Sequence, residues 1–395
     1  MSEHSRYLRR GVSASKDEVH SAIAHLDKGL YPTAFCKILP DIVGGSPEHC
    51  NIMHADTAGT KTSLAYIYWR ETGDLSVWEG IVQDALVMNL DDMACVGCIQ
   101  DIVISSTIGR NKHLIPGEVL NTLIGAQSHF VEKMADLGIR LHLAGGETAD
   151  VGDIVRTVDV GFTTFARMPR ARLIVNDIQP GDAIVGLASF GKAAWESEYN
   201  GGMGSNGLTS ARHDVFAHLY AERYPESFDP ALPDDVVYTG SRLLTDTLEV
   251  EGQQLTIGKL VLSPTRTYLP LLKAVFDNID QSQLHGIIHC TGGGQTKVLK
   301  FIRNCSVVKD RPFPVPPLFQ LIKEESGTSW REMYQVFNMG HRLEIYLPPA
   351  LAPQVIEMAE SLRIAAQVVG RVEEAKGEEL LIHTPGGVER YGTPG

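Results

Sequence analysis

The sequence contains no apolar run long enough to cross a membrane. No segment of the 395-residue chain approaches about eighteen uninterrupted apolar residues, the minimum for a spanning helix. The first twenty residues carry charges without a following apolar block, so we expect no secretory signal. A membrane protein is therefore not predicted.

Basic residues are also scarce. Lys and Arg number 35 against 48 Asp and Glu, which gives a formal net charge of −13. This balance disfavours a general affinity for nucleic acid or for anionic membranes. An anionic ligand would need local attraction from lysines, helix N-termini or a bound cation.

Cysteines are few and scattered: Cys36, Cys50, Cys95, Cys98, Cys290 and Cys305. The spacing is not that of a disulfide framework and predicts a reduced, cytoplasmic protein. Cys95 and Cys98 form a lone C-x-x-C without a second pair or a nearby histidine. We interpret them as small packing residues of a helix, because zinc usually needs four ligands.

Two familiar nucleotide-binding signatures are missing. The chain has neither the P-loop pattern G-x-x-x-x-G-K-[ST] nor a β-α-β unit with G-x-G-x-x-G. It also has no short-period repeat and no low-complexity run. A P-loop enzyme and a dinucleotide fold are therefore not supported.

The length favours two domains, because 395 residues exceed what one compact core usually holds. We expect an N-terminal extension over 1–45, a first domain over 46–174 and a second over 175–395. The polar stretch NDIQPGD at 176–182 consists largely of turn-forming residues and follows the proposed boundary. Both domains mix strands and helices, so the predicted fold class is α/β (α+β).

Patterning and turn residues predict the individual elements. In the first domain we expect strands in 51–57, 100–109 and 155–168, helices over 76–97 and 116–138, and a short strand from 139 that enters a turn at Gly145 and Gly146. In the second domain we expect strands at 183–189, 286–290, 342–347, 366–372 and 379–383, and helices near 208–222, 266–278 and 351–362.

The helix over 76–97 is apolar yet carries three aspartates. Asp84 and Asp91 are seven residues apart, about 20° from the same face, and Asp92 lies roughly 80° to the side. An ionised carboxylate among apolar neighbours is costly unless it is paired or metal-bound, and neighbouring acids repel unless a cation lies between them. We favour a Mg²⁺ site that also includes Asp56 and Glu147. The alternative is a helix whose acidic side faces water.

Lys61 directly follows the small-residue stretch DTAGT at 56–60. Small residues let backbone N–H groups approach a ligand closely, and a lysine beside them can act as a point charge on phosphate. A single lysine in a loop is more often simply solvated. Lys61 is therefore a candidate site residue only in combination with the neighbouring aspartates and Glu147.

Two glycine-rich stretches of the second half are candidate anion sites. The stretch EYNGGMGSNGLTS at 198–210 precedes a probable helix and could form an anion-binding nest, although a flexible loop explains it equally well. HCTGGGQTK at 289–297 is the stronger candidate, since its glycines stand between a strand and a helix. His289 lies at the strand end, where it is either a buried core residue or a catalytic or substrate-contacting one.

Several motifs coincide, in order, over most of the chain. They are RYLRRGV near the start, DTAGTK at 56–61, QDALVMNLDDMACVG at 83–97, GGETAD at 145–150, GDAIVGLAS at 181–189, GSNGL at 204–208, SPTRTY at 263–268, HCTGGG at 289–294 and FNMG at 337–340. Together they resemble the aminoimidazole ribonucleotide (AIR) synthase family, also called phosphoribosylformylglycinamidine cyclo-ligases. Any one motif is weak, whereas their order and spacing are specific.

The resemblance implies two α/β domains per chain. The N-terminal domains would pair in a homodimer that closes a β-barrel from both chains, and the C-terminal domain would be an α/β sandwich. ATP and Mg²⁺ would bind at the N-terminal domains, with the phosphoribosyl substrate in a cleft between the halves.

The reaction implied by the resemblance is a ring closure in purine biosynthesis. ATP would phosphorylate the formamide oxygen of formylglycinamidine ribonucleotide, and the amidine nitrogen would then attack. The products would be aminoimidazole ribonucleotide, ADP and phosphate. Phosphoryl transfer depends more on cations and positioning than on a protein nucleophile.

Matching the motifs assigns roles to residues. The implied Mg²⁺ ligands are Asp56, Asp84, Asp92 and Glu147. The implied ATP-binding set is Asp56, Gly59, Thr60, Lys61, Asp84, Asp91, Asp92, Gly145, Gly146, Glu147 and Thr148. The implied catalytic residues are Lys61, which would neutralise the transferring phosphate, and His289 and Thr291, which would orient substrate or move a proton. The implied substrate-binding residues are Ser205, Asn206, His289, Gly292 and Gly293.

The departures from the family pattern lie mainly on the substrate side. Gly204 stands where the family usually has His, and Asp91 where it usually has Asn. The stretch after Gly294 reads QTKVLKF in place of LxENxPR, the glycine-rich phenylalanine loop is reduced to AFCKILPD and VGG, and the region 191–204 is longer. These changes leave two alternatives open. One is a superfamily kinase or ligase with another acceptor, such as selenophosphate synthetase, thiamine-phosphate kinase or the hydrogenase-maturation dehydratase. The other is a non-enzymatic nucleotide sensor.

Overall fold

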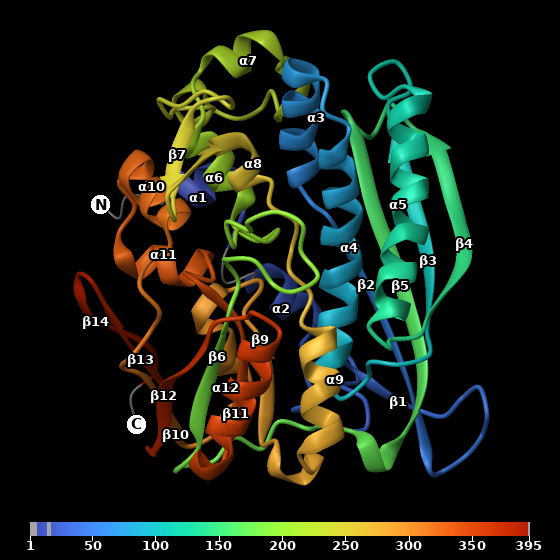
Figure 1. Ribbon diagram of the computed structural model, residues 1–395, viewed down its shortest axis with the longest axis vertical. Coiled ribbons are helices and arrows are strands. Elements are labelled where there is room, and N and C mark those ends of the chain that lie inside the picture. Colours follow the sequence, from blue (N-terminus) through green and yellow to red (C-terminus); the bar gives the residue numbers. More distant parts are fainter. Residues whose placement is uncertain (1–5, 14–16, 394–395) are drawn as a thin grey trace.

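Two α/β units lie side by side in the computed structural model, which describes residues 6–13 and 17–393 (Figure 1). The first unit is built on a five-stranded sheet and the second on a seven-stranded sheet. Within the described residues, no helix has the length and apolar character needed to cross a bilayer.

The sheet of the first unit has the strand order β1-β2-β5-β3-β4. The strands are β1 (Ile38–Pro40), β2 (His49–Thr57), β3 (Ile102–Arg110), β4 (Leu141–Asp150) and β5 (Val158–Pro169). All neighbours pair antiparallel except β3 and β4, which are parallel. Burial alternates along β3, as expected for a sheet that is covered on one face only.

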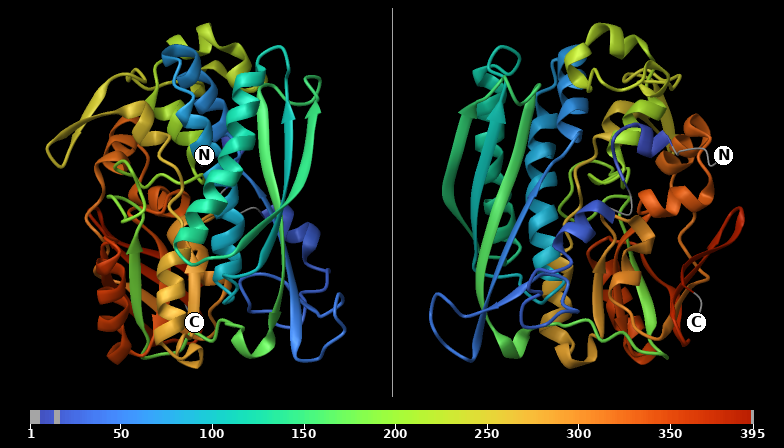
Figure 2. Two further views of the ribbon diagram at one scale, coloured as in Figure 1. Left: turned by 45° about the vertical axis from the view of Figure 1, so that its right-hand side comes forward. Right: turned by 180° about the vertical axis from the view of Figure 1, so that it is seen from behind.

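Helices cover one face of this sheet (Figures 1 and 2). They are α3 (Lys61–Thr72), α4 (Ser76–Ala94) and α5 (Gly117–Asp136). Helix α4 contacts β2, β5, α3 and α5, so it forms the centre of the unit. It also faces the second unit, which explains why its residues are buried on nearly all sides.

Strand β4 corrects the turn predicted at Gly145 and Gly146. The strand continues through both glycines to Asp150, because it pairs in parallel with β3 along its length. Gly145 has φ +83° at a register shift, and a Cβ on Gly146 would lie 2.2 Å from Ser106 Oγ. The glycines therefore permit a bulge and a close strand approach instead of a turn.

The sheet of the second unit has the strand order β14-β13-β10-β12-β6-β11-β9. The strands are β6 (Ala183–Ala188), β9 (Gly286–His289), β10 (Cys305–Lys309), β11 (His341–Leu347), β12 (Ala366–Glu374), β13 (Glu378–Thr384) and β14 (Gly387–Thr393). Helices α9 (Leu269–Asn278) and α12 (Ala352–Ser361) contact each other, and α12 packs on β6 and β12.

Several elements of both units differ from the prediction. The helix expected near 208–222 is two short helices, α6 (Leu208–Val215) and α7 (Leu219–Arg223), and α9 begins three residues later than expected. The elements not predicted are α3, β1, β10, β14, the hairpin of β7 (Thr247–Val250) and β8 (Gln253–Thr256), and helices α8 (Ile257–Val261), α10 (Pro317–Ser326) and α11 (Trp330–Val336). Most of these are short and have too few residues to show a period.

Parts of the predicted N-terminal extension contact both units. Helix α1 (Arg6–Arg9) packs on α6, and the adjacent Arg10 donates to Asp214 Oδ1 at 2.7 Å and to the carbonyl of Val236 at 2.9 Å. Strand β1 pairs with β2 in the first sheet. The second helix of this segment, α2, spans Asp17–Ile23.

Candidate active site

The three aspartates of α4 point into the boundary between the two units and not into water. Asp84 and Asp91 are 0% exposed and Asp92 is 7% exposed, so the alternative of a solvated acidic face is wrong. Asp84 Oδ1 accepts hydrogen bonds from the backbone N–H of Thr265 at 2.7 Å and from its hydroxyl at 2.5 Å. About two helical turns further along α4, Asp91 accepts hydrogen bonds from the Thr267 hydroxyl at 2.7 Å and from the N–H of Tyr268 at 2.9 Å. The shared face predicted for Asp84 and Asp91 thus holds the segment 263–268.

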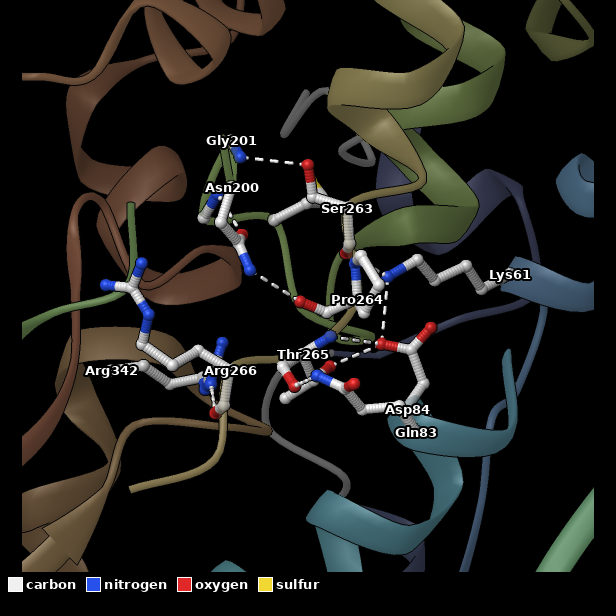
Figure 3. Close-up of polar contacts among 12 residues, drawn as sticks. Lys61, Gln83, Asp84, Asn200, Gly201, Ser263, Pro264, Thr265, Arg266 and Arg342 are labelled. Carbon is white, nitrogen blue, oxygen red and sulfur yellow. Dashed lines mark hydrogen bonds and ion pairs between the residues drawn. The ribbon is translucent and has the colours of Figure 1, made fainter. Parts of the chain in front are cut away.

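Lys61 is the first residue of α3, and its side chain is fully buried. Its Nζ donates to Asp84 Oδ1 at 2.9 Å and to the carbonyl of Ser263 at 2.6 Å (Figure 3). Burial lowers the pKa of the Lys61 ammonium, and the charge of Asp84 opposes that shift. Lys61 therefore connects α3, α4 and the second unit at one point.

Asp92 lies between two histidines. Its Oδ1 accepts from His289 Nδ1 at 2.7 Å, and its Oδ2 lies 3.4 Å from His54 Nε2. Burial acts to raise the pKa of Asp92, but the two histidines outweigh it and hold that pKa well below its usual range. Burial acts to lower the pKa of His54, but the interaction with Asp92 outweighs burial and raises that pKa. The arrangement fixes the orientation of His289 at the end of β9.

The glycine-rich stretch before α6 is tied to the segment 263–268. Asn200 Nδ2 donates to the carbonyl of Pro264 at 2.8 Å, and the Gly201 N–H donates to Ser263 Oγ at 2.8 Å (Figure 3). Beside this contact lies a pocket of about 590 Å³, bordered by α4, the loop 192–200, β8 and Ser263–Pro264. The predicted substrate residues Ser205 and Asn206 follow in the same stretch and are half-buried.

The second predicted glycine stretch forms a tight turn after β9. His289 is fully buried and Thr291 nearly so, while Gly292 and Gly293 are half-buried. Gly293 has φ +96°, which L side chains rarely adopt, and a 3₁₀ helix (η5, Gly294–Lys300) follows in place of the expected α-helix. The turn lies next to the Asp92–His289 contact.

The structure does not gather the four predicted Mg²⁺ ligands. Asp84 is bonded to Lys61 and Asp92 to histidines, while Glu147 and Thr148 are exposed on β4. Asp56 on β2 is separated from β4 by two intervening strands, which corresponds to roughly 14 Å. Gly59 and Thr60, just before α3, are also exposed. Within the described ranges, no three His, Cys, Asp or Glu side chains are placed to hold a metal ion, so a single cage does not fit these residues.

Three further parts of the site were not predicted as site residues. They are the hydroxyl pair Thr265 and Thr267, the buried Arg342, and the residues Asn200 and Ser263, which tie the glycine-rich stretch to the segment 263–268. In the sequence, the motif SPTRTY contributes only to the family resemblance. Its alternating hydroxyls are the signal that could have paired it with the aspartates of α4.

Two family models match the chain. One, described as AIR synthase related protein, N-terminal domain, matches residues 37–168, and the other, described as the C-terminal domain, matches 179–383. These matches confirm the predicted family resemblance and the two-unit fold class.

Related sequences carry one name. A phosphoribosylformylglycinamidine cyclo-ligase of Methanococcus vannielii is 26% identical over 97% of this chain and 95% of that protein. Another, of Methanothermobacter thermautotrophicus, is 28% identical over 83% of this chain and 81% of that protein. Both cover most of this chain and most of their own length.

Solved structures share the fold at low identity. The HypE–HypF complex has a TM-score of 0.53 at 12% identity, covering 95% of this chain and 98% of that chain. AaThiL complexed with AMPPCP and TMP has a TM-score of 0.50 at 11% identity, covering 93% and 91%. At such identities the likeness shows the fold alone.

Proposed function

Because the chain belongs to the AIR synthase related family, we propose that it is an ATP-dependent cyclo-ligase that converts formylglycinamidine ribonucleotide into aminoimidazole ribonucleotide, ADP and phosphate in purine biosynthesis. The relatives named cyclo-ligases, which match nearly the whole chain, support this activity. The observation that carries the proposal is the buried set of Lys61, Asp84, Asp92 and His289 at the boundary between the units.

Lys61 would supply the positive charge near the transferring phosphoryl group. An ammonium group has three protons, and two of them are used by Asp84 and the Ser263 carbonyl. The third proton is available to a phosphate oxygen. Asp84 and Ser263 would therefore hold the Lys61 ammonium in place, so that it need not move during phosphoryl transfer.

His289 is better placed to orient substrate than to take a proton. Its Nδ1–H donates to Asp92, and its Nε2 accepts a hydrogen bond from Arg342 Nε at 3.2 Å. Both ring nitrogens are thus engaged. We propose that Thr291 holds the substrate next to the turn at Gly292 and Gly293, and that His289 orients it indirectly by positioning Arg342.

ATP is proposed as the phosphoryl donor. Three exposed residues of the first unit would contact ATP. Gly59 and Thr60 directly precede α3, and Thr148 lies on β4. Mg²⁺ would supply charge neutralisation to the triphosphate, but the four predicted carboxylates do not converge on one position.

Free, buried thiols fit a cytoplasmic enzyme. All six cysteines are free and buried. Burial raises the pKa of the Cys98 thiol to about 12, so it does not ionise near neutral pH. We therefore propose the reducing cytoplasm as the location.

The acceptor is tested by genetic rescue and by turnover. We expect this chain to restore growth of a purine-requiring strain that lacks AIR synthase. The purified protein should hydrolyse ATP only when formylglycinamidine ribonucleotide is present, as measured by ADP release and product formation. A folded protein that does neither would have another acceptor or no catalytic activity.

We further propose that two copies pair through the uncovered face of the first sheet. Met53, Phe165 and Val103 are aligned across β2, β5 and β3 on that face, and Met53 is 61% exposed. Such an aligned apolar row on an open sheet face indicates an interface.

Charge placed on this face should separate the dimer. We expect the double variant Met53→Lys/Val103→Lys to be monomeric at micromolar concentration in multi-angle light scattering, while the wild type is a dimer. Ile124→Lys, at an exposed apolar residue of α5, is the matched control and should remain dimeric. A monomeric wild type, or a dimeric double variant, would contradict this interface.

A further inference from the structure

Arg342, on β11, is a buried arginine without an acidic partner. It is 2% exposed, and no carboxylate of the described residues lies within 4.0 Å of its guanidinium nitrogens. Its Nε donates to His289 Nε2 and its NH2 donates to the carbonyl of Arg266, while NH1 is buried with no hydrogen-bond partner. The guanidinium lies over the Tyr268 ring, with Cζ 5.5 Å from the ring centroid. Burial raises the pKa of Asp91 and the charge of Arg342 opposes that shift, but Asp91 makes no direct ion pair with Arg342. A buried cation that no carboxylate contacts directly costs several kcal/mol unless an anion is supplied.

The open NH1 points toward the glycine-rich stretch. A Cβ added to Gly204 would lie 3.4 Å from Arg342 NH1 and 3.9 Å from Thr265 Oγ1. Any side chain placed at position 204 would therefore contact Arg342 NH1. The hydroxyl of the next residue, Ser205, is also buried without a partner among the residues described.

The nearby charges leave this position favourable for an anion. Asp84 is bonded to Lys61 and Thr265, and Asp91 is bonded to Thr267, so both carboxylates have donors of their own. Lys61 lies close enough that Arg342 adds to the effect of burial in lowering its pKa. Two cations thus occupy one neighbourhood.

We propose that Arg342 binds a phosphate group through NH1, with Ser205 as a second contact, beneath the glycine-rich stretch at 200–206. Guanidinium groups match phosphate oxygens in geometry and charge. This assignment rests on the proposed function and adds to it the residue that recognises a phosphate of the phosphoribosyl substrate or of the nucleotide.

The phosphate would enter by displacement of the stretch 200–206. The stretch is held by Asn200 and Gly201 on Ser263–Pro264, and Asn338 Nδ2 donates to the Gly202 carbonyl at 2.8 Å. Gly202 and Gly204 have φ +83° and +70°, so the backbone here is of the kind that glycine adopts without strain. The 590 Å³ pocket borders the outer side of this contact.

Binding of inorganic phosphate, ribose 5-phosphate and a non-hydrolysable ATP analogue should depend on Arg342. The measurements are calorimetric titration and the shift in melting temperature. Arg342→Met should weaken binding of at least one probe by roughly tenfold or more, because a charged hydrogen bond is lost. Its melting temperature without ligand should be unchanged or higher, since an unpaired buried charge is removed. Whichever of ribose 5-phosphate and the ATP analogue depends more on Arg342 identifies the source of the phosphate.

The matched control is Arg10→Met. Arg10 is 3% exposed and fully bonded to Asp214, Ser210 and Val236, so its loss should lower the melting temperature without changing phosphate affinity. If Arg342→Met does not fold, Arg342→Lys tests the site in its place. Lysine keeps the positive charge but lacks the paired donors of the guanidinium group, so binding should still weaken several-fold. Wild-type affinity in a folded Arg342 variant, or a wild type that binds none of the probes, would overturn the site.

Turnover on formylglycinamidine ribonucleotide, measured on the same preparations, separates the two proposals. Phosphate binding that depends on Arg342 without turnover keeps the site and rejects the cyclo-ligase. Turnover without such binding keeps the cyclo-ligase and rejects the site.

Discussion

Replacing Lys61 with methionine is expected to abolish turnover and to lower the free energy of unfolding by about 3–5 kcal/mol. Asp84 is 0% exposed, and its Oδ2 already lacks a hydrogen-bond partner in the described structure. Without Lys61, the carboxylate would keep only its two bonds from Thr265 inside the protein. Removal of one member of a buried pair is costly because the other charge remains buried.

Denaturant unfolding of single and double variants measures this effect. The double variant Lys61→Met/Asp84→Asn should lose less stability than the sum of its single variants, because no unpaired charge remains. Lys259→Met is the matched control: Lys259 pairs with Asp74 at 3.1 Å but is 35% exposed, so the expected loss is below about 1 kcal/mol. Additive single effects, or a Lys61→Met protein as stable as the control, would contradict a coupled buried pair.

Loss of turnover is to be measured at a temperature at which Lys61→Met is folded. A nucleotide sensor would bind ATP with or without this lysine and would show no acceptor-dependent hydrolysis in either form. A cyclo-ligase loses product formation while nucleotide binding is largely kept. Residual turnover near the wild-type rate would remove Lys61 from the catalytic residues.

The aspartates of α4 show what spacing and burial cost can predict. Helical spacing correctly put Asp84 and Asp91 on one face, and the cost of burying carboxylates correctly required partners for them. The partners themselves could not be derived, because Thr265 and Thr267 lie 181 and 176 residues further along the chain in an extended segment. Such a segment has no period that links it to a helix.

Glycines were ambiguous in a different way. The pair Gly145 and Gly146 is equally compatible with a turn and with a bulged strand, and only the pairing of β4 with β3 decides between them. Arg342 gave no signal either, since it lies in a strand, HRLEIYL, whose residues are all buried. The neighbours of Arg342 are His289, Arg266 and Gly204, which are far apart in the sequence. The lack of a partner for NH1 could therefore be recognised only in the folded structure.

Replacing Glu344 with glutamine is expected to lower the free energy of unfolding by about 3–5 kcal/mol at neutral pH. Glu344 is fully buried in the second unit, paired with Lys309, and accepts from His341 Nε2 at 2.8 Å and the Tyr346 hydroxyl at 2.7 Å. The variant would leave Lys309 with neutral acceptors only, such as the two oxygens of Gln295 at 2.8 and 3.0 Å. An unpaired ammonium would then remain in the core.

The same substitution should change the acid limb of the stability curve. Burial acts to raise the pKa of Glu344, but Lys309 and His341 outweigh it and lower the pKa to about 2. The unfolded value is about 4.3, so the stabilisation is complete above that pH and is lost as the pH falls toward 2. The difference between wild type and Glu344→Gln should therefore shrink over this range in urea unfolding.

Glu373→Gln is the control, because the pair of Glu373 with Arg371 is about half exposed and should contribute less than about 1 kcal/mol. The double variant Lys309→Met/Glu344→Met should recover much of the lost stability, since an apolar pair needs no buried counter-charge. The cluster also reaches the candidate site: Gln295, directly after the glycine turn, donates to the carbonyls of Asn338 and His341 at 2.6 and 2.9 Å. A folded Glu344→Gln protein should therefore show a raised KM for the phosphoribosyl substrate. Unchanged stability together with an unchanged KM would show that the cluster supports neither the core nor the turn.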